Sequence, residues 1–135
     1  MTARKQVSVS GKRKTAVARA NAVKGTGKIR VNKVPIEIVV PELARTKMME
    51  PVVIAGEKAA KMNIEVSVAG GGIMGQAEAV RAALANAIVD FLEDDELKHK
   101  YLAYDRSILI NDVRFKEPKH FGGRGARKRQ QKSYR

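Results

Sequence analysis

The last seventeen residues, 119–135, constrain this chain most, because they cannot form a core of their own. They contain seven Lys or Arg, three Gly, no Asp or Glu and no branched aliphatic residue. A segment with high charge and low hydrophobicity cannot recover its ordering entropy by burial. We therefore expect a globular domain over residues 1–117 and an extended basic tail over residues 118–135, which takes a fixed shape only against a polyanion.

The side chains of this tail suit RNA. Arg offers a planar fork to phosphate, and the rings of Phe121 and Tyr134 can stack on bases. Glycines let the backbone lie close to a surface. The alternative is a solvated terminus that only aids solubility. The rest of the chain favours RNA, because the formal net charge is +13 over all 135 residues.

A charge excess of this size attracts nucleic acid or an anionic membrane surface. The membrane is the weaker option, since no stretch reaches the roughly 18 consecutive apolar residues of a spanning helix. The N-terminus shows no apolar signal region, so we expect a cytosolic protein. The absence of Cys excludes disulfides and thiolate metal sites.

Alternating apolar residues predict strands over 6–10, 15–24 and 28–31. The Gly-containing segment 25–27 predicts a hairpin, so the three strands are expected to be local and antiparallel. A short basic turn, Lys12 to Lys14, is expected between the first two strands. It is either a solvated loop or a place where Lys12, Arg13 and Lys14 contact phosphate.

Helical composition begins at Glu42, and Pro51 predicts a kink or two helical pieces, the second ending near Gly56. Residues 61–69 form the clearest strand pattern, and Gly70 to Gly72 end it. The clearest helix is expected over 74–92 and should cover the sheet. The residues expected off its apolar stripe are Glu78, Arg81, Asn86, Asp90 and Glu93. Asp94 and Asp95 can start a short helix that closes at Tyr104, and residues 107–110 are expected to dock on the domain.

Catalysis has no candidate group in this sequence. The glycine-rich stretch 69–75 precedes a helix, but Gln76 and Ala77 stand where a phosphate-binding loop needs Lys and Ser or Thr. Close strand-helix packing or an RNA phosphate contact explains it better. His99 and His120 stand apart without carboxylates at ligand spacing, so we expect no metal and no cofactor.

Several motifs in fixed order resemble one family over essentially the whole chain. They are Gly11-Lys-Arg-Lys-Thr-Ala16, the segment 25–27, Gly70-Gly-Gly72 with Gln76-Ala77, Asp105-Arg106, Phe121-Gly-Gly-Arg-Gly-Ala-Arg127 and Gln131-Lys-Ser-Tyr-Arg135. Together they resemble the ribosomal protein S-nine family of the small subunit. The ending Lys132 to Arg135 is similar to the archaeal and eukaryotic branch, and the short N-terminus favours an archaeon.

The resemblance implies an α+β two-layer sandwich in which a four-stranded mixed sheet carries helices on one face. This is the architecture of the second domain of ribosomal protein S-five, with an uncommon left-handed βαβ crossover that periodicity alone would not predict. Small-molecule kinases of the galactokinase type share it, which makes a kinase the first alternative. The chain is too short for one and lacks their phosphate-binding serines, and fold alone does not carry function.

The implied function is that of a structural constituent of the small-subunit head, in the cytoplasmic ribosome, with neighbouring head proteins and no small-molecule substrate. The body would bind the 3′ major domain of the ribosomal RNA, and the tail would reach the peptidyl-site tRNA. By position, the residues expected at ribosomal RNA are Lys12, Arg13, Lys14, Lys119, Arg124, Arg127, Lys128 and Arg129. Those expected at tRNA are Lys132, Tyr134 and Arg135. The second alternative is a free-standing module for single-stranded RNA.

Overall fold

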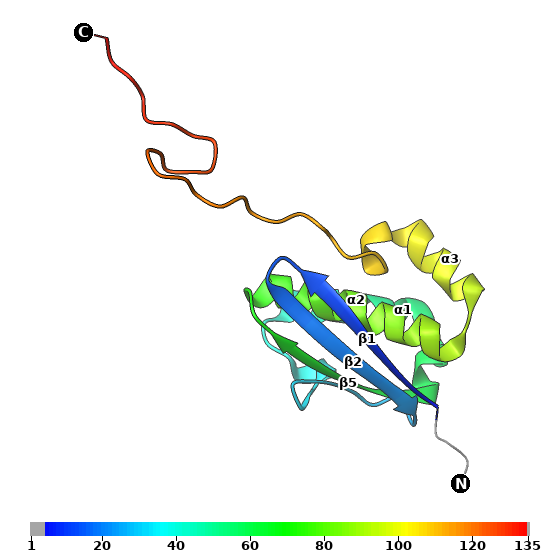
Figure 1. The fold of residues 1–135 in the computed structure, drawn as a ribbon. Helices are drawn as coiled ribbons and strands as arrows, with labels where there is room; N and C mark the ends of the chain where they lie inside the picture. Colours follow the sequence, from blue (N-terminus) through cyan, green and yellow to red (C-terminus); the bar gives the residue numbers. More distant parts are fainter. Residues whose placement is uncertain (1–4, 135) are drawn as a thin grey trace.

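A computed structural model describes residues 5–134, and its body consists of two layers, a sheet and a set of helices (Figure 1). The strands are β1 (Gln6–Arg13), β2 (Ala16–Lys24), β3 (Ile29–Val31), β4 (Val34–Pro35) and β5 (Met62–Ala69). The helices are α1 (Glu42–Ala55), α2 (Ile73–Leu92) and α3 (Asp95–Tyr104). Short 3-10 turns lie at η1 (Ile36–Ile38), η2 (Gly56–Lys61) and η3 (Arg106–Ile108). The α+β class and the mixed sheet are as expected.

The order of strands in the sheet is β1-β2-β5-β3-β4. β5 is antiparallel to β2 and parallel to β3. The expected sheet of four strands is therefore wrong by one, because Val34–Pro35, expected as a connector, pairs with β3 as β4. The expected hairpin at residues 25–27 is also wrong, because β5 lies between β2 and β3.

The segment 25–28 turns around the beginning of β5 instead of closing a hairpin. The Asn63 side-chain oxygen accepts hydrogen bonds from the Thr26 N–H at 2.8 Å and the Lys28 N–H at 3.0 Å. The Gly25 and Gly27 N–H groups bond to the carbonyls of Lys61 and Met62. Backbone groups that a hairpin would have paired with each other are thus satisfied by the strand between them.

The core is assembled from small side chains where the sheet meets α2. Every second residue of β2 is a fully buried alanine, from Ala16 to Ala22, and α2 contributes six more buried alanines. Small residues on both surfaces let the helix and the sheet approach closely. The larger buried side chains include Met62, Ile64, Leu84 and Ile88.

Helix α1 runs without interruption through Pro51 to Ala55, so of the two expected outcomes the division into two helical pieces is wrong, whereas the end near Gly56 is confirmed. Pro51 is buried, and its carbonyl accepts a 2.7 Å hydrogen bond from the buried hydroxyl of Tyr101 in α3. Packing of the proline ring and this hydrogen bond offset the backbone hydrogen bond that proline cannot donate.

Helices α2 and α3 begin and end close to the expected residues. Asp94 caps α3, as expected, by accepting hydrogen bonds from the N–H groups of Glu96 and Leu97 at 3.0 and 3.2 Å. Such a cap satisfies donors that the first helical turn leaves free. Ile108 in η3 is fully buried and docks the segment after α3 on the body.

Beyond Ile108 the described part of the chain contains no helix or strand, and it runs away from the body as an irregular segment (Figure 1). None of the described helices is both long enough and apolar enough to cross a membrane.

Candidate nucleic-acid interface

Of the three basic residues expected in a turn after Gly11, two lie at the end of a strand and one lies in the turn. Lys12 and Arg13 are the last residues of β1, and Lys14 and Thr15 form the turn to β2. Alternation along a strand sends adjacent side chains to opposite faces of the sheet. The side chains of Lys12 and Arg13 therefore lie on opposite faces of the sheet; Lys12 and Lys14 are exposed, and Arg13 is half-buried.

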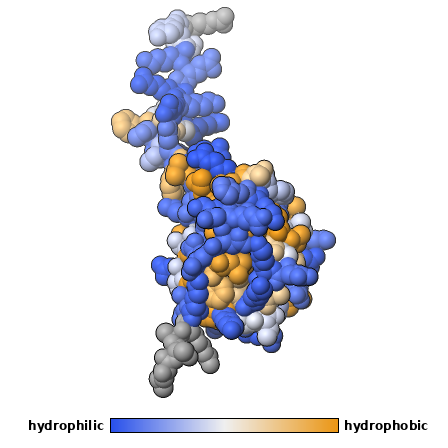
Figure 2. Space-filling view, turned by 90° about the vertical axis from the view of Figure 1, so that its right-hand side faces the viewer, coloured by the Kyte–Doolittle hydropathy of each residue, from blue (hydrophilic) through white to orange (hydrophobic). Residues whose placement is uncertain are grey.

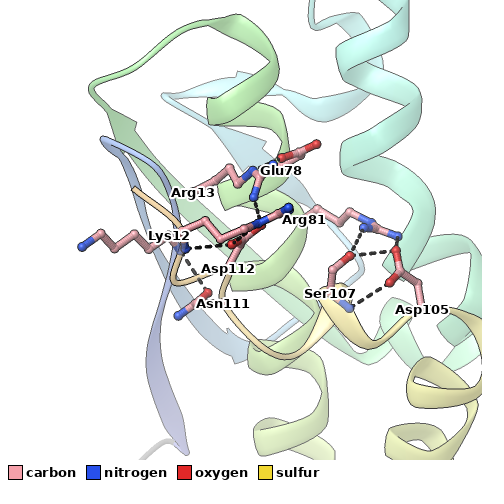
Figure 3. A network of polar contacts seen from close by, with 9 residues as sticks. Lys12, Arg13, Glu78, Arg81, Asp105, Ser107, Asn111 and Asp112 are labelled. Atoms are coloured by element: carbon pink, nitrogen blue, oxygen red, sulfur yellow. Dashed lines mark hydrogen bonds and ion pairs between the residues drawn. The ribbon is translucent and has the colours of Figure 1, made fainter. Parts of the chain in front are cut away.

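Residues 111–117 lead from η3 into the tail, and we call them the beginning of the tail. Arg13 holds them against α2 through Asp112 (Figure 3). Its Nε lies 2.6 Å from the Oε2 of Glu78 in α2, and its Nη1 pairs with the carboxylate of Asp112. The same Asp112 carboxylate accepts from Arg114, with Nη2 at 2.7 Å. These three ion pairs, which we call the latch, fix the point where the tail leaves the body.

Lys12 also contacts the beginning of the tail, from the face of the sheet opposite to Arg13. Its backbone N–H donates to the side-chain oxygen of Asn111 at 3.1 Å, and its Nζ lies 4.4 Å from the centre of the Phe115 ring. A cation above an aromatic face is attracted by the ring quadrupole. Between these contacts and α2 is a hollow of about 140 Å³, lined mainly by charged side chains.

Arg81 was expected on the outside of α2, and this expectation is wrong, because it is 5% exposed. Its Nε lies 2.5 Å from Glu50 Oε2, and its Nη2 and Nη1 bond to Asp105 and Ser107 at 3.0 and 3.1 Å. A buried charge is tolerated when it is paired and hydrogen-bonded in this way. Sequence reasoning missed this group because its members lie far apart in the chain, although Asp105 was singled out within a motif.

The Asp105 carboxylate stabilises the segment between α3 and the tail. It accepts from the hydroxyl and the N–H of Ser107 at 2.7 and 2.8 Å. These hydrogen bonds from Ser107, with a further one from Arg81, lower the pKa of Asp105 below its ordinary value. The charged form of Asp105 is therefore part of the folded structure.

The glycine-rich stretch 70–72 is explained by packing. Gly70 and Gly71 have positive φ angles of 79° and 67°. A Cβ on Gly70 would lie 2.6 Å from the carbonyl oxygen of Thr15. Gly70 and Gly71 therefore pack closely against the turn between β1 and β2, and not between a strand and a helix as expected.

The predicted tail residues lie in the irregular segment, and all that are described are exposed: Lys119, Arg124, Arg127, Lys128, Arg129, Lys132 and Tyr134. Arg135 lies outside the described residues. Figure 2 shows this segment as an almost continuous hydrophilic surface that stands clear of the body. The tail cations thus present a multivalent surface to an anion, apart from the body.

One internal ion pair bends the tail. The Arg127 guanidinium donates twice to the Glu117 carboxylate, at 2.9 Å from Nε and 2.6 Å from Nη2. This contact lowers the pKa of Glu117 and raises the pKa of Arg127. The Gln130 N–H also donates to the Gly122 carbonyl at 3.2 Å, so that residues 117–130 form a loop.

Together, the fold and these surfaces define a basic α+β protein with an alanine-rich body and a cationic tail. Within residues 5–134 no three His, Asp or Glu side chains lie together in a way that could hold a metal ion.

Comparison with known proteins gives the family. Residues 11–135 match the family model described as "Ribosomal protein S9/S16". The chain is 56% identical to "Small ribosomal subunit protein uS9" of Methanothrix thermoacetophila, over 97% of this chain and 99% of that protein. It is 53% identical to the protein of the same name from Thermoplasma acidophilum, over 93% and 98%. The identity to the protein of the same name from Halobacterium salinarum is 51%, over 95% of this chain and 98% of that protein. The chain belongs to the ribosomal protein S9 family, in its archaeal branch, and this family is structural and not enzymatic.

Proposed function

We propose that this protein is a structural constituent of the small ribosomal subunit, where its body binds ribosomal RNA in the head and its tail reaches the peptidyl-site tRNA. The observation that carries this proposal is the exposed basic segment after Pro118, held to the body at one end by the latch. Because the tail is fixed at one end, it always starts from the same place on the body, and its positive charges can follow the phosphates of an RNA.

The exposed tail residues Lys119, Arg124, Arg127, Lys128 and Arg129 are the proposed ribosomal RNA contacts. Lys132, Tyr134 and Arg135 follow them and are the proposed tRNA contacts. A phosphate contact is independent of base sequence, which suits a site that must accept every tRNA. Ordering entropy is lost once, during assembly, so the tail then meets each tRNA already ordered.

Arg127 is proposed to exchange partners during assembly. In the free chain its two hydrogen bonds go to Glu117. An RNA phosphate offers the same bidentate geometry, so the internal loop can open when phosphate replaces the carboxylate.

On the body, Lys12 and Lys14 are the proposed phosphate contacts. Arg13 already faces two carboxylates. Its proposed contribution to RNA binding is therefore mainly to hold the beginning of the tail. We further propose that the β3–α1–β5 connection is the left-handed crossover of the S-five type, with neighbouring head proteins around it.

The test is removal of the last three residues, 133–135, from subunits reconstituted around this protein. We expect weaker peptidyl-site tRNA binding and a smaller dependence of affinity on salt, since phosphate contacts set the salt slope. Assembly should continue, because the upstream cations remain. A truncated subunit with the same tRNA affinity and salt slope as the full one would refute the role of the tail end.

A further inference from the structure

Charge is divided unevenly between the two layers of the body. Residues 1–36 contain ten Lys or Arg and no Asp or Glu, whereas residues 37–105 contain twelve acidic residues against seven basic ones. Strands β1 to β4 belong to the first segment, and all three helices belong to the second. Strand β5 also lies in the second segment and brings one of its acidic residues, Glu65, into the sheet. Apart from Glu65, the sheet is the cationic layer, and the helices with their connections form an anionic layer.

One face of the sheet has no helix on it, because α2 packs against β1, β2 and β5 from one side (Figure 1). The alanines of β2 face that helix, so the residues between them point to the open face. In the register of the sheet, Arg19 of β2 lies between Ser10 of β1 and Ser67 of β5. In the next row, Asn21 lies beside Glu65, and Glu65 lies beside Arg30 of β3.

The cations on this face form no ion pair within the described residues, although Glu65 lies beside Arg30 in the sheet. Arg19 and Arg30 are exposed and form no ion pair there, and the same holds for Lys12. By contrast, Arg13 on the helix side faces two carboxylates. Glu65 is the one acidic residue that the described strands place on the open face.

We propose that the open face of the sheet, centred on Arg19 and Arg30, is a second RNA-binding surface that contacts the sugar-phosphate backbone. This inference rests on the proposed function, because it names a further RNA contact of the same protein. Serine and asparagine side chains around the two arginines are short, so a phosphate backbone can approach closely and accept their hydrogen bonds. No strand residue of this face is aromatic, so the surface binds backbone and not unstacked bases.

Lys12 makes the open face continuous with the tail. It lies at the end of β1 and touches both Asn111 and Phe115. One RNA element can therefore follow the sheet and then the tail. The anionic helical layer is left facing away from this RNA, since like charges repel.

Substitutions that remove charge test whether the positive charge of the open face strengthens RNA binding. The variant Arg19→Gln/Arg30→Gln is compared with Lys98→Gln/Lys100→Gln, which removes two exposed charges from α3. Binding of full-length protein to a transcript of small-subunit ribosomal RNA is measured over a salt series. We expect about tenfold weaker binding and a salt slope lower by about two for the sheet variant, and a much smaller change for the α3 variant.

The opposite change should strengthen binding. Glu65→Gln removes the acid from the open face, and we expect several-fold tighter binding, whereas Glu57→Gln in η2 should have little effect. Equal losses from the sheet and α3 double variants, with Glu65→Gln no tighter than Glu57→Gln, would overturn the proposal.

A tethered probe locates the RNA, because the chain has no Cys of its own. Single-cysteine variants Ser67→Cys on the open face, Ala103→Cys on α3 and Gln131→Cys in the tail carry an iron chelate that cleaves nearby RNA in assembled subunits. We expect strong cleavage from positions 67 and 131 and weak cleavage from 103. Cleavage from 131 without cleavage from 67 would overturn the sheet surface and leave the proposed function standing. Cleavage from neither position would contradict the proposed function itself. If an acidic protein covered the sheet instead of RNA, position 67 would be shielded and its chelate would cleave no RNA.

Discussion

Gly11 shows how one residue sets the distance between the layers. It is buried in β1, where a Cβ would lie 2.2 Å from the Ala79 carbonyl oxygen and 2.6 Å from the Ala83 nitrogen of α2. Both atoms belong to the backbone and cannot rotate away. The strand can therefore approach α2 only because residue 11 has no side chain.

We expect Gly11→Ala to lower the free energy of unfolding by about 3 kcal/mol, because the added methyl forces strand and helix apart. Urea denaturation followed by circular dichroism measures this. The control is Gly72→Ala, where a Cβ meets nothing within 4 Å and φ is −101°. Equal stability of the two variants would contradict the argument from packing.

Tyr101 is a second residue whose contribution depends on burial. Its hydroxyl bonds to the Pro51 carbonyl, and burial raises the pKa of its phenol above the ordinary value of 10.0. Tyr101→Phe should lower the free energy of unfolding by about 1–2 kcal/mol, since the buried Pro51 carbonyl loses its hydrogen-bond donor. Tyr104→Phe, at a 60% exposed position of the same helix, should cost almost nothing.

The raised pKa of Tyr101 also predicts a pH dependence. The unfolded chain releases the phenol proton first, so the stabilisation is complete below about pH 10 and is lost as pH rises above it. Unfolding free energies measured between pH 8 and 11 should fall more steeply for the natural protein than for Tyr101→Phe. Parallel curves would show that Tyr101 ionises freely in the folded state.

At the scale of elements, the latch connects three segments that are distant in the sequence. The end of β1 contributes Arg13, α2 contributes Glu78, and the beginning of the tail contributes Asp112. The Arg114 N–H also donates to Asp112 at 2.9 Å. The direction in which the tail leaves the body is thus decided by a strand end and a helix side, and not by the tail itself.

We expect Asp112→Ala to release the beginning of the tail while the body stays folded. Hydrogen exchange should accelerate at the backbone amides of Lys12 and Arg114, whose acceptors lie on residues 111 and 112. Global stability should change by no more than about 1 kcal/mol, as is usual for partly exposed ion pairs. Glu117→Gln, farther along the tail, serves as the comparison and should leave the Lys12 amide unchanged. Unaltered exchange at Lys12 in Asp112→Ala would mean that the tail is held by something other than the latch.

At the scale of the whole molecule, stability and binding are located in different parts. Among residues 5–134 the last buried residue is Ile108, whereas seven of the chain's basic residues lie at or beyond residue 119. The body therefore carries the hydrophobic free energy, and the tail carries much of the positive charge that we propose meets RNA.

We expect a chain truncated after Pro118 to unfold at the same urea concentration as the full chain, because the described residues beyond it add nothing to the core. Its affinity for small-subunit ribosomal RNA should fall by at least tenfold at moderate salt, with a shallower salt slope. A matched chain of full length, in which the seven tail cations are replaced by Gln, separates loss of charge from loss of length. A clear drop in the urea midpoint on truncation would show that the tail folds with the body.

The sequence by itself determined the longer helices and strands, since periods of 2 and 3.6 residues are local properties of the chain, but it did not show the two-residue strand β4. It also determined the composition of the tail, and the motifs indicated the family that the comparisons confirmed. The position of β5 between β2 and β3 was decided by tertiary structure, because these strand pairings join residues 35 to 52 positions apart. Burial of Arg81 was decided in the same way, since Glu50, Asp105 and Ser107 come together only when α1, α2 and η3 pack. The sequence shows the charge of Arg13 but not its partners. Glu78 and Asp112 lie 65 and 99 positions away and come close to Arg13 only in the folded chain, so a local pattern does not predict these ion pairs.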